Sequence, residues 1–123
     1  MGKSQRDKGK RGEQELARLF RDYGFKDAHR TQQFCGRGGE SADVIGLPNI
    51  HVESKRTEKL SLYDAIAQAK SDAKEGNLPA VFHRRNNCEW LVIMPFDAWM
   101  EIYREFHSSM MLGKKTTTIA TNF

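Results

Sequence analysis

Apolar residues recur every three or four positions in two segments, which predicts two amphipathic helices. The first helix covers residues 9–23 and ends at Gly24. Its apolar side holds Leu16, Leu19, Phe20 and Tyr23. The other of these helices lies near the C-terminal end of the chain. It begins at Pro95, a residue type favoured in the first turn of helices. Its apolar side holds Phe96, Trp99, Met100, Tyr103 and Phe106.

Shorter apolar and alternating segments between these helices predict β-strands. The predicted strands cover residues 25–30, 42–47, 50–56, 79–84 and 89–94. Pro48 and Asn49 favour a hairpin between the second and third of these strands. A further helix is expected between Ser61, whose side chain would cap it with Asp64 three residues on, and Gly76, which would end it.

The predicted order is α-β-β-β-α-β-β-α, which indicates an α/β fold with a mixed central β-sheet flanked by helices. We expect one domain over residues 12–112, preceded by a basic N-terminal arm over 1–11 and followed by a tail over 113–123. Three glycines in residues 31–41 predict a loop there.

The composition, with 38% hydrophobic and 29% charged residues, is that of a globular protein. No apolar run approaches the roughly 20 residues that cross a bilayer, and the polar N-terminus predicts no secretory signal. Cys35 and Cys88 show no zinc-type spacing, so we favour two reduced thiols over a disulfide or a metal site. These features predict a cytoplasmic protein.

The formal net charge of +4 resides in residues 1–11, which hold five basic side chains and one acidic one. The rest of the chain is neutral overall. A basic arm on a neutral body fits a polyanionic partner such as nucleic acid, but it also fits a solvated tail.

Asp43, Glu53 and Lys55 form the strongest candidate for chemistry. Alternate residues of a strand share one face, so Glu53 and Lys55 point the same way, and the hairpin brings Asp43 towards Glu53. Two carboxylates at one place repel each other unless a cation lies between them. Oxygen ligands without cysteine favour Mg²⁺, or Mn²⁺ in its place. A nearby ammonium would orient water and balance charge on a phosphate.

The same polar residues would also suit an exposed edge strand without a function. Three further residues favour a site, each with a simpler alternative. Glu13 heads the apolar side of the first helix and points to the sheet, although an acidic residue also suits a helix start. Arg30 could bind a phosphate, or it could be an exposed surface residue without a function. Gln68 could bond a catalytic group or serve only as a helix former.

Taken together, these segments resemble the PD-(D/E)XK nuclease superfamily, and most closely the archaeal-type (Hjc-like) Holliday junction resolvases and their phage relatives. The similarity runs over about residues 8–95. It rests on Lys8 to Leu16, on the strand ending in Arg30, on Ala42-Asp43-Val44-Ile45, and on Val52-Glu53-Ser54-Lys55. It implies a restriction-endonuclease-like fold.

The resemblance implies a role for each matching residue. Asp43, Glu53 and the Ser54 carbonyl would bind Mg²⁺, with Glu13 supporting that ion or a second one. Lys55 would position the attacking water, and Arg30 would contact the scissile phosphate. The further DNA-binding residues that we expect are Lys8, Lys10, Arg11, Arg37 and Gln68.

The resemblance also implies a homodimer that resolves four-way DNA junctions by phosphodiester hydrolysis, without a small-molecule cofactor and without a membrane. The aromatic side of the last helix, with Trp99, Tyr103 and Phe106, would serve either the dimer or the core. Two other readings stay open: a nicking or restriction-type endonuclease of the same superfamily, and a DNA-binding module without catalysis.

Overall fold

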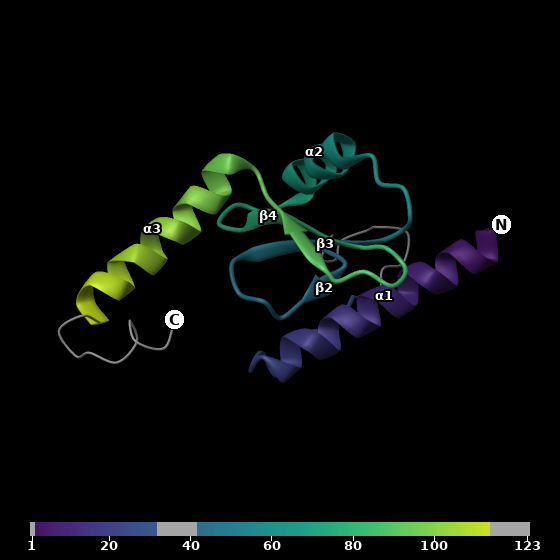
Figure 1. The fold of residues 1–123 in the computed structure, drawn as a ribbon, viewed down its shortest axis with the longest axis horizontal. Helices are drawn as coiled ribbons and strands as arrows, with labels where there is room; N and C mark the ends of the chain where they lie inside the picture. The colour runs from purple at the N-terminus through teal and green to yellow at the C-terminus, as the bar shows by residue number, and fades with distance from the viewer. Residues whose placement is uncertain (1, 32–41, 114–123) are drawn as a thin grey trace.

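The computed structural model describes residues 2–31 and 42–113. Within these residues, three helices and five strands follow one another in the predicted order, and Figure 1 shows their arrangement. The helices are α1 (Gly2–Asp22), α2 (Leu62–Asp72) and α3 (Phe96–Gly113). The strands are β1 (His29–Arg30), β2 (Val44–Ile45), β3 (Ile50–Arg56), β4 (Leu78–Arg84) and β5 (Leu91–Ile93).

The strands form one mixed sheet in the order β1-β2-β3-β4-β5. β3 and β4 are parallel, with Val52 opposite Ala80, and the other neighbours are antiparallel. The parallel pair needs a crossover, and α2 supplies it. The predicted fold class, a mixed sheet flanked by helices as in restriction endonucleases, is therefore confirmed.

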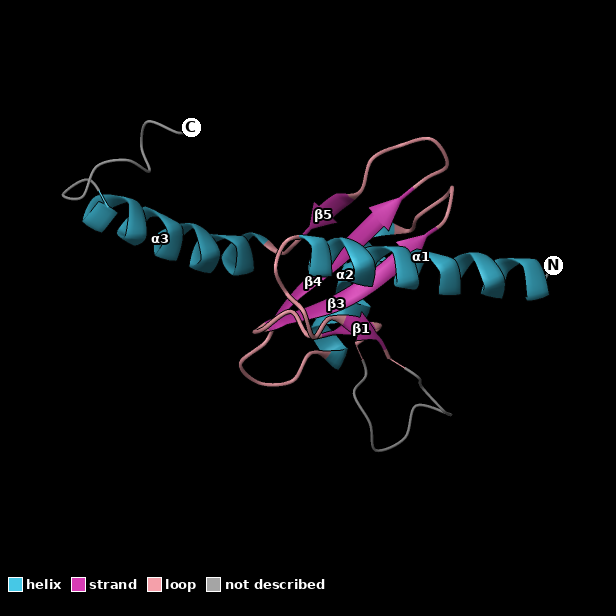
Figure 2. Ribbon diagram, turned by 90° about the horizontal axis from the view of Figure 1, so that it is seen from below, coloured by secondary structure: helices cyan, strands magenta, loops and turns pink. Residues whose placement is uncertain are grey.

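The two faces of β3 pack against different helices (Figures 1 and 2). Val52 joins the larger core cluster, in which Leu16 and Ala17 of α1 pack on the sheet. Val81 lies opposite Glu53 in the neighbouring strand and packs against Ala65 and Ala69 of α2. Even-numbered residues of β3 therefore face α1, and odd-numbered residues face α2.

Several predicted boundaries differ from the structure. α1 begins at Gly2 instead of residue 9, so most of the predicted arm continues the helix. The strand predicted over 25–30 keeps only its last two residues, because hydrogen bonds from the Gly24 and Ala28 amides fold the rest into turns. α2 ends at Asp72, before Gly76, and the Ser61 hydroxyl bonds Asp64 instead of capping the backbone.

α3 extends away from the sheet (Figures 1 and 2). Its aromatic side chains are exposed. Trp99 and Tyr103 stack with their ring centroids 5.2 Å apart, and Phe106 follows at 6.2 Å from Tyr103. Trp99 is 49% exposed. Core packing, one of the two roles expected for this side, does not occur within the described residues.

Candidate functional site

Asp43 is held in place by backbone hydrogen bonds on both sides. Its amide donates to the Val52 carbonyl at 2.9 Å, and its carbonyl accepts from the Thr31 amide at 3.0 Å. Its carboxylate accepts a hydrogen bond of 2.8 Å from the Ser54 amide. Asp43, the residue just before β2, is therefore held beside β3 through both its backbone and its side chain.

Glu53 and Lys55 share the α2 side of β3, as the alternation predicts. Glu53 is buried, with 3% of its surface exposed. The Lys55 ammonium lies 3.5 Å from the amide oxygen of Gln68 on α2. The structure therefore brings Gln68 to the lysine of the candidate site, which favours its expected role as a partner of a catalytic group.

Glu13 joins the site from α1. Its carboxylate accepts a hydrogen bond of 2.8 Å from Nε of Arg30 in β1. Gly12, the preceding residue, allows this approach, since a Cβ there would lie only 2.6 Å from Cβ of Arg56. A larger residue at position 12 would push α1 away from β3 and Glu13 with it.

The charged neighbours of the site affect the pKa of two of its carboxyl groups, Asp43 and Glu13. Burial raises the pKa of Asp43 from 3.8 to about 7, and repulsion by Glu53 and Glu13 adds to the increase. The hydrogen bond from the Ser54 amide and the positive charge of Lys55 act in the opposite direction and lower the pKa of Asp43. Burial also raises the pKa of Glu13, against the opposing effect of Arg30. The main electrostatic feature of the site is therefore the repulsion between neighbouring carboxylates that are partly shielded from water.

His51 is a site residue that the sequence reasoning missed. Its Nε2 lies 2.8 Å from Oε1 of Glu53, and both side chains are almost fully buried. The Nδ1 atom of this ring has no hydrogen-bond partner among the described residues. Alternation along β3 was the available signal, because His51 shares a face with Glu53 and Lys55.

A family model described as "phage putative PDDEXK endonuclease" matches residues 4–122. The chain belongs to this family. No curated protein and no solved structure matches the chain. Membership makes the protein a nuclease of the PD-(D/E)XK superfamily, with DNA as its substrate. Within the described residues, no helix is long and apolar enough to cross a membrane.

PDDEXK endonucleases use a divalent metal ion, and the donor atoms of this site fit one. Asp43 and Glu53 offer hard carboxylate oxygens next to each other, and burial strengthens their repulsion in the absence of a cation. A second group, His51, Glu53 and Asp72, places one ligand atom of each residue within 4.8 Å of the others. Both groups contain Glu53.

Three of the remaining predicted DNA-binding residues lie on α1, before Glu13 in the chain. Lys8, Lys10 and Arg11 lie on the N-terminal half of α1, and Lys8 forms an ion pair of 3.2 Å with Glu58. Arg37 lies outside the described residues. Of the two cysteines, Cys35 also lies outside them, and Cys88 is a free thiol. Nothing in the described structure therefore tests the role expected for Arg37.

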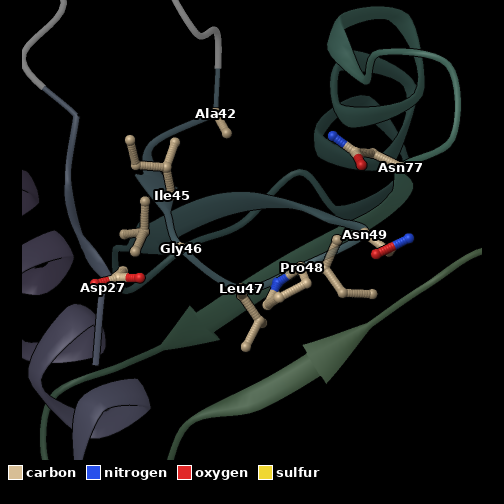
Figure 3. A pocket seen from close by; sticks show the side chains of 10 residues that line it. Asp27, Ala42, Ile45, Gly46, Leu47, Pro48, Asn49 and Asn77 are labelled. Atoms are coloured by element: carbon tan, nitrogen blue, oxygen red, sulfur yellow. The ribbon is translucent and has the colours of Figure 1, made fainter. Parts of the chain in front are cut away.

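A cavity of about 310 Å³ lies beside the β2–β3 turn of this endonuclease (Figure 3). Its labelled lining includes Gly46, Leu47, Pro48 and Asn49, with Asp27 and Asn77 as polar groups. None of the four charged residues of the candidate site lines it. This cavity is therefore not where the acidic cluster would act.

The raised pKa of Asp43 predicts a pH-dependent stability in the absence of metal. Between about pH 4 and 7 the folded carboxyl keeps a proton that the unfolded chain has lost. The free energy of unfolding therefore falls as pH rises through this range, by roughly 4 kcal/mol in total, and is level above it. The Asp43→Asn variant has no carboxyl group to titrate at this position, so this fall in the free energy of unfolding does not occur. In chelator, its stability advantage over the wild type should grow by roughly 2 to 3 kcal/mol between pH 5 and pH 8.

Urea unfolding at the two pH values measures this difference. The matched control is Asp22→Asn, which changes an exposed carboxylate at the end of the same helix that carries Glu13. An advantage of Asp43→Asn that is equal at both pH values would show that Asp43 titrates normally.

Proposed function

We propose that this protein hydrolyses phosphodiester bonds in branched DNA and resolves four-way junctions with the help of Mg²⁺. The observation that carries the hydrolytic part is the convergence of Glu13, Asp43, Glu53 and Lys55 on one partly buried site. The choice of a junction rests on the sequence similarity to Holliday junction resolvases.

Each residue of the site has a role in this proposal. Asp43, Glu53 and the Ser54 carbonyl hold the metal ion, and Glu13 supports it. When bound, the ion supplies a more acidic water molecule and a polarised phosphate. Lys55 orients the attacking water and balances the developing negative charge. Gln68 accepts a hydrogen bond from Lys55 and so limits the positions of its ammonium.

Arg30 connects the metal side of the site to the substrate. Its Nε is bonded to Glu13, which leaves the outer edge of the guanidinium to contact the scissile phosphate. The same contact holds Glu13 in place when no DNA is bound. Arg30 therefore has two roles in the proposal, one for the helix carboxylate and one for the phosphate.

A cleavage assay with a four-way junction, a nicked duplex and a linear duplex of the same sequence tests the proposal. With Mg²⁺, the wild type should cut the junction in preference to the duplexes. Lys55→Ala should slow cleavage by about 100- to 1,000-fold, the typical cost of one preorganised charged group. Asp43→Asn should lose at least as much, whereas Asp22→Asn should cut normally.

Each alternative has its own outcome in this assay. Equal cutting of the linear duplex would replace junction resolution by a nicking or restriction-type activity. Binding of DNA without cleavage at any Mg²⁺ concentration would leave a DNA-binding module. Full activity of Asp43→Asn would disprove the proposed centre itself.

We further propose that a second copy of the chain covers the aromatic side of α3, so that two active sites act on one junction. An 18-residue helix is about 27 Å long, and this one extends away from its own sheet (Figure 2). Its stacked rings are exposed. Apolar surface of this kind on one side of a projecting helix is typical of association sites.

Replacing both Trp99 and Tyr103 by glutamate should convert the dimer to a monomer, because charges at a buried interface remain unpaired. Sedimentation velocity measures the change. The control is Arg104→Glu, which changes the charge on a different side of the same helix. A wild-type protein that sediments as a monomer at micromolar concentration would reject this assembly.

A further inference from the structure

A second cavity, of about 410 Å³, lies between α1 and the carboxyl ends of β3 and β4. Among the described residues that line it, four are basic and one is acidic. The lining consists of Lys8, Arg11, Gly12, Glu15, Arg56, Arg84 and Asn86. Such a concentration of cations in a hollow is the chemistry that recognises a phosphate.

The ion pairs within this cavity do not cancel its charge. Glu15 binds Arg84 through both carboxylate oxygens at 2.9 Å, and Glu58 contacts Lys8 at 3.2 Å and Arg56 at 4.0 Å. Two carboxylates thus face four cations, which leaves a net charge of +2. Arg11 is exposed and has no ion-pair partner among the described residues.

The contacts of Arg84 and Arg56 hold their guanidinium groups in fixed positions. Arg84 Nε donates to the Cys88 carbonyl at 2.6 Å, in addition to its contact with Glu15. Arg56 donates from Nη1 to Asn86 at 3.1 Å. Preorganised guanidinium groups lose little conformational entropy when an anion arrives.

The cavity and the candidate catalytic site are built from adjacent residues. Lys55 faces α2, and Arg56 faces α1 from the next position of β3. In α1, Glu13 joins the acidic cluster, and the preceding Gly12 lines the cavity. The two places therefore lie at the same end of β3, towards opposite faces of the sheet, and a DNA strand that passes this end contacts both.

We propose that this cavity binds a backbone phosphate of the DNA substrate, beside the phosphate that is cut. Arg11 and Arg56 make the principal contacts with the phosphate. Arg84 and Lys8 contribute the remaining positive charge of the cavity. The inference rests on the proposed function, since it assumes that DNA is bound at the acidic cluster. Binding here uses charge alone, so it is independent of base sequence.

The test measures DNA binding in the Asp43→Asn background, where cleavage does not interfere. Fluorescence anisotropy with a labelled four-way junction is recorded over a range of KCl concentrations. Arg11→Ala and Arg56→Met should each weaken binding roughly ten-fold near 50 mM salt and lower the slope of log K against log salt by about 0.9. Methionine keeps the aliphatic stem of Arg56 against Gly12, so the helix contact is preserved.

Lys70→Ala is the control, because Lys70 is an exposed cation on α2 that does not line this cavity. It should leave affinity and slope unchanged. If the parent binds the junction but both arginine variants bind equally well, the phosphate site is wrong while the nuclease proposal stands. If the parent binds no DNA, the proposed function itself fails.

An independent observation concerns His51, and we infer that it is a positioning residue for Glu53. With Glu53 ionised, Nε2 of His51 must donate the 2.8 Å hydrogen bond to Oε1. That bond fixes the plane of a carboxylate that has almost no contact with solvent. Partners of this kind orient the ligands of a metal ion, and in this role His51 supports Glu53 instead of serving as a ligand itself in the group with Asp72.

His51→Leu removes the donor, and His51→Gln retains an N–H at a similar place. The leucine variant should raise the Mg²⁺ concentration for half-maximal cleavage roughly 10- to 100-fold, whereas glutamine should restore most of the loss. Thermal unfolding in chelator separates this effect from a loss of folding. An unchanged Mg²⁺ dependence in His51→Leu, or a glutamine variant as impaired as leucine, would overturn the inference.

Discussion

The structure depends on placing two carboxylates, Asp43 and Glu53, on neighbouring strands where water is largely excluded. Burial of one such charge is costly, and a second charge of the same sign increases the cost. The pKa of Asp43, raised to about 7, expresses this cost. The Ser54 amide and the Lys55 ammonium reduce it without removing it. A site that stays unfavourable without a cation is suited to bind one.

The helix α1 contributes to the site through a contact that only a glycine permits. At Gly12 the backbone of α1 lies against the stem of Arg56, and no Cβ would fit between them. The packing of Leu16 and Ala17 in the core fixes the helix one turn further on. Glu13 is therefore carried to the site by a rigid element, and Arg30 holds its carboxylate there.

The order of the elements was predictable because each has a clear period, two for the strands and 3.6 for the helices. The beginning of α1 was not, since residues 2–8 contain no apolar residue that could show a helical period. Asp43, Glu53 and Lys55 were proposed as a site from strand alternation together with the hairpin expected at Pro48 and Asn49. The bonds of Glu15 to Arg84 and Trp90 join residues about 70 positions apart, which no local pattern reveals.

The strand β3 contributes residues both to the candidate catalytic site and to the basic cavity. Its odd-numbered residues run from His51 through Glu53 to Lys55, and each contacts or influences a polar group of the candidate site. Its even-numbered residues begin in the core with Val52 and end at Arg56, beside the basic cavity. The apolar positions bury the strand, and burial is what makes the carboxylates interact strongly. A shift of register by one residue would move both sets to the wrong face, so the stability of the sheet and the assembly of the site are the same requirement.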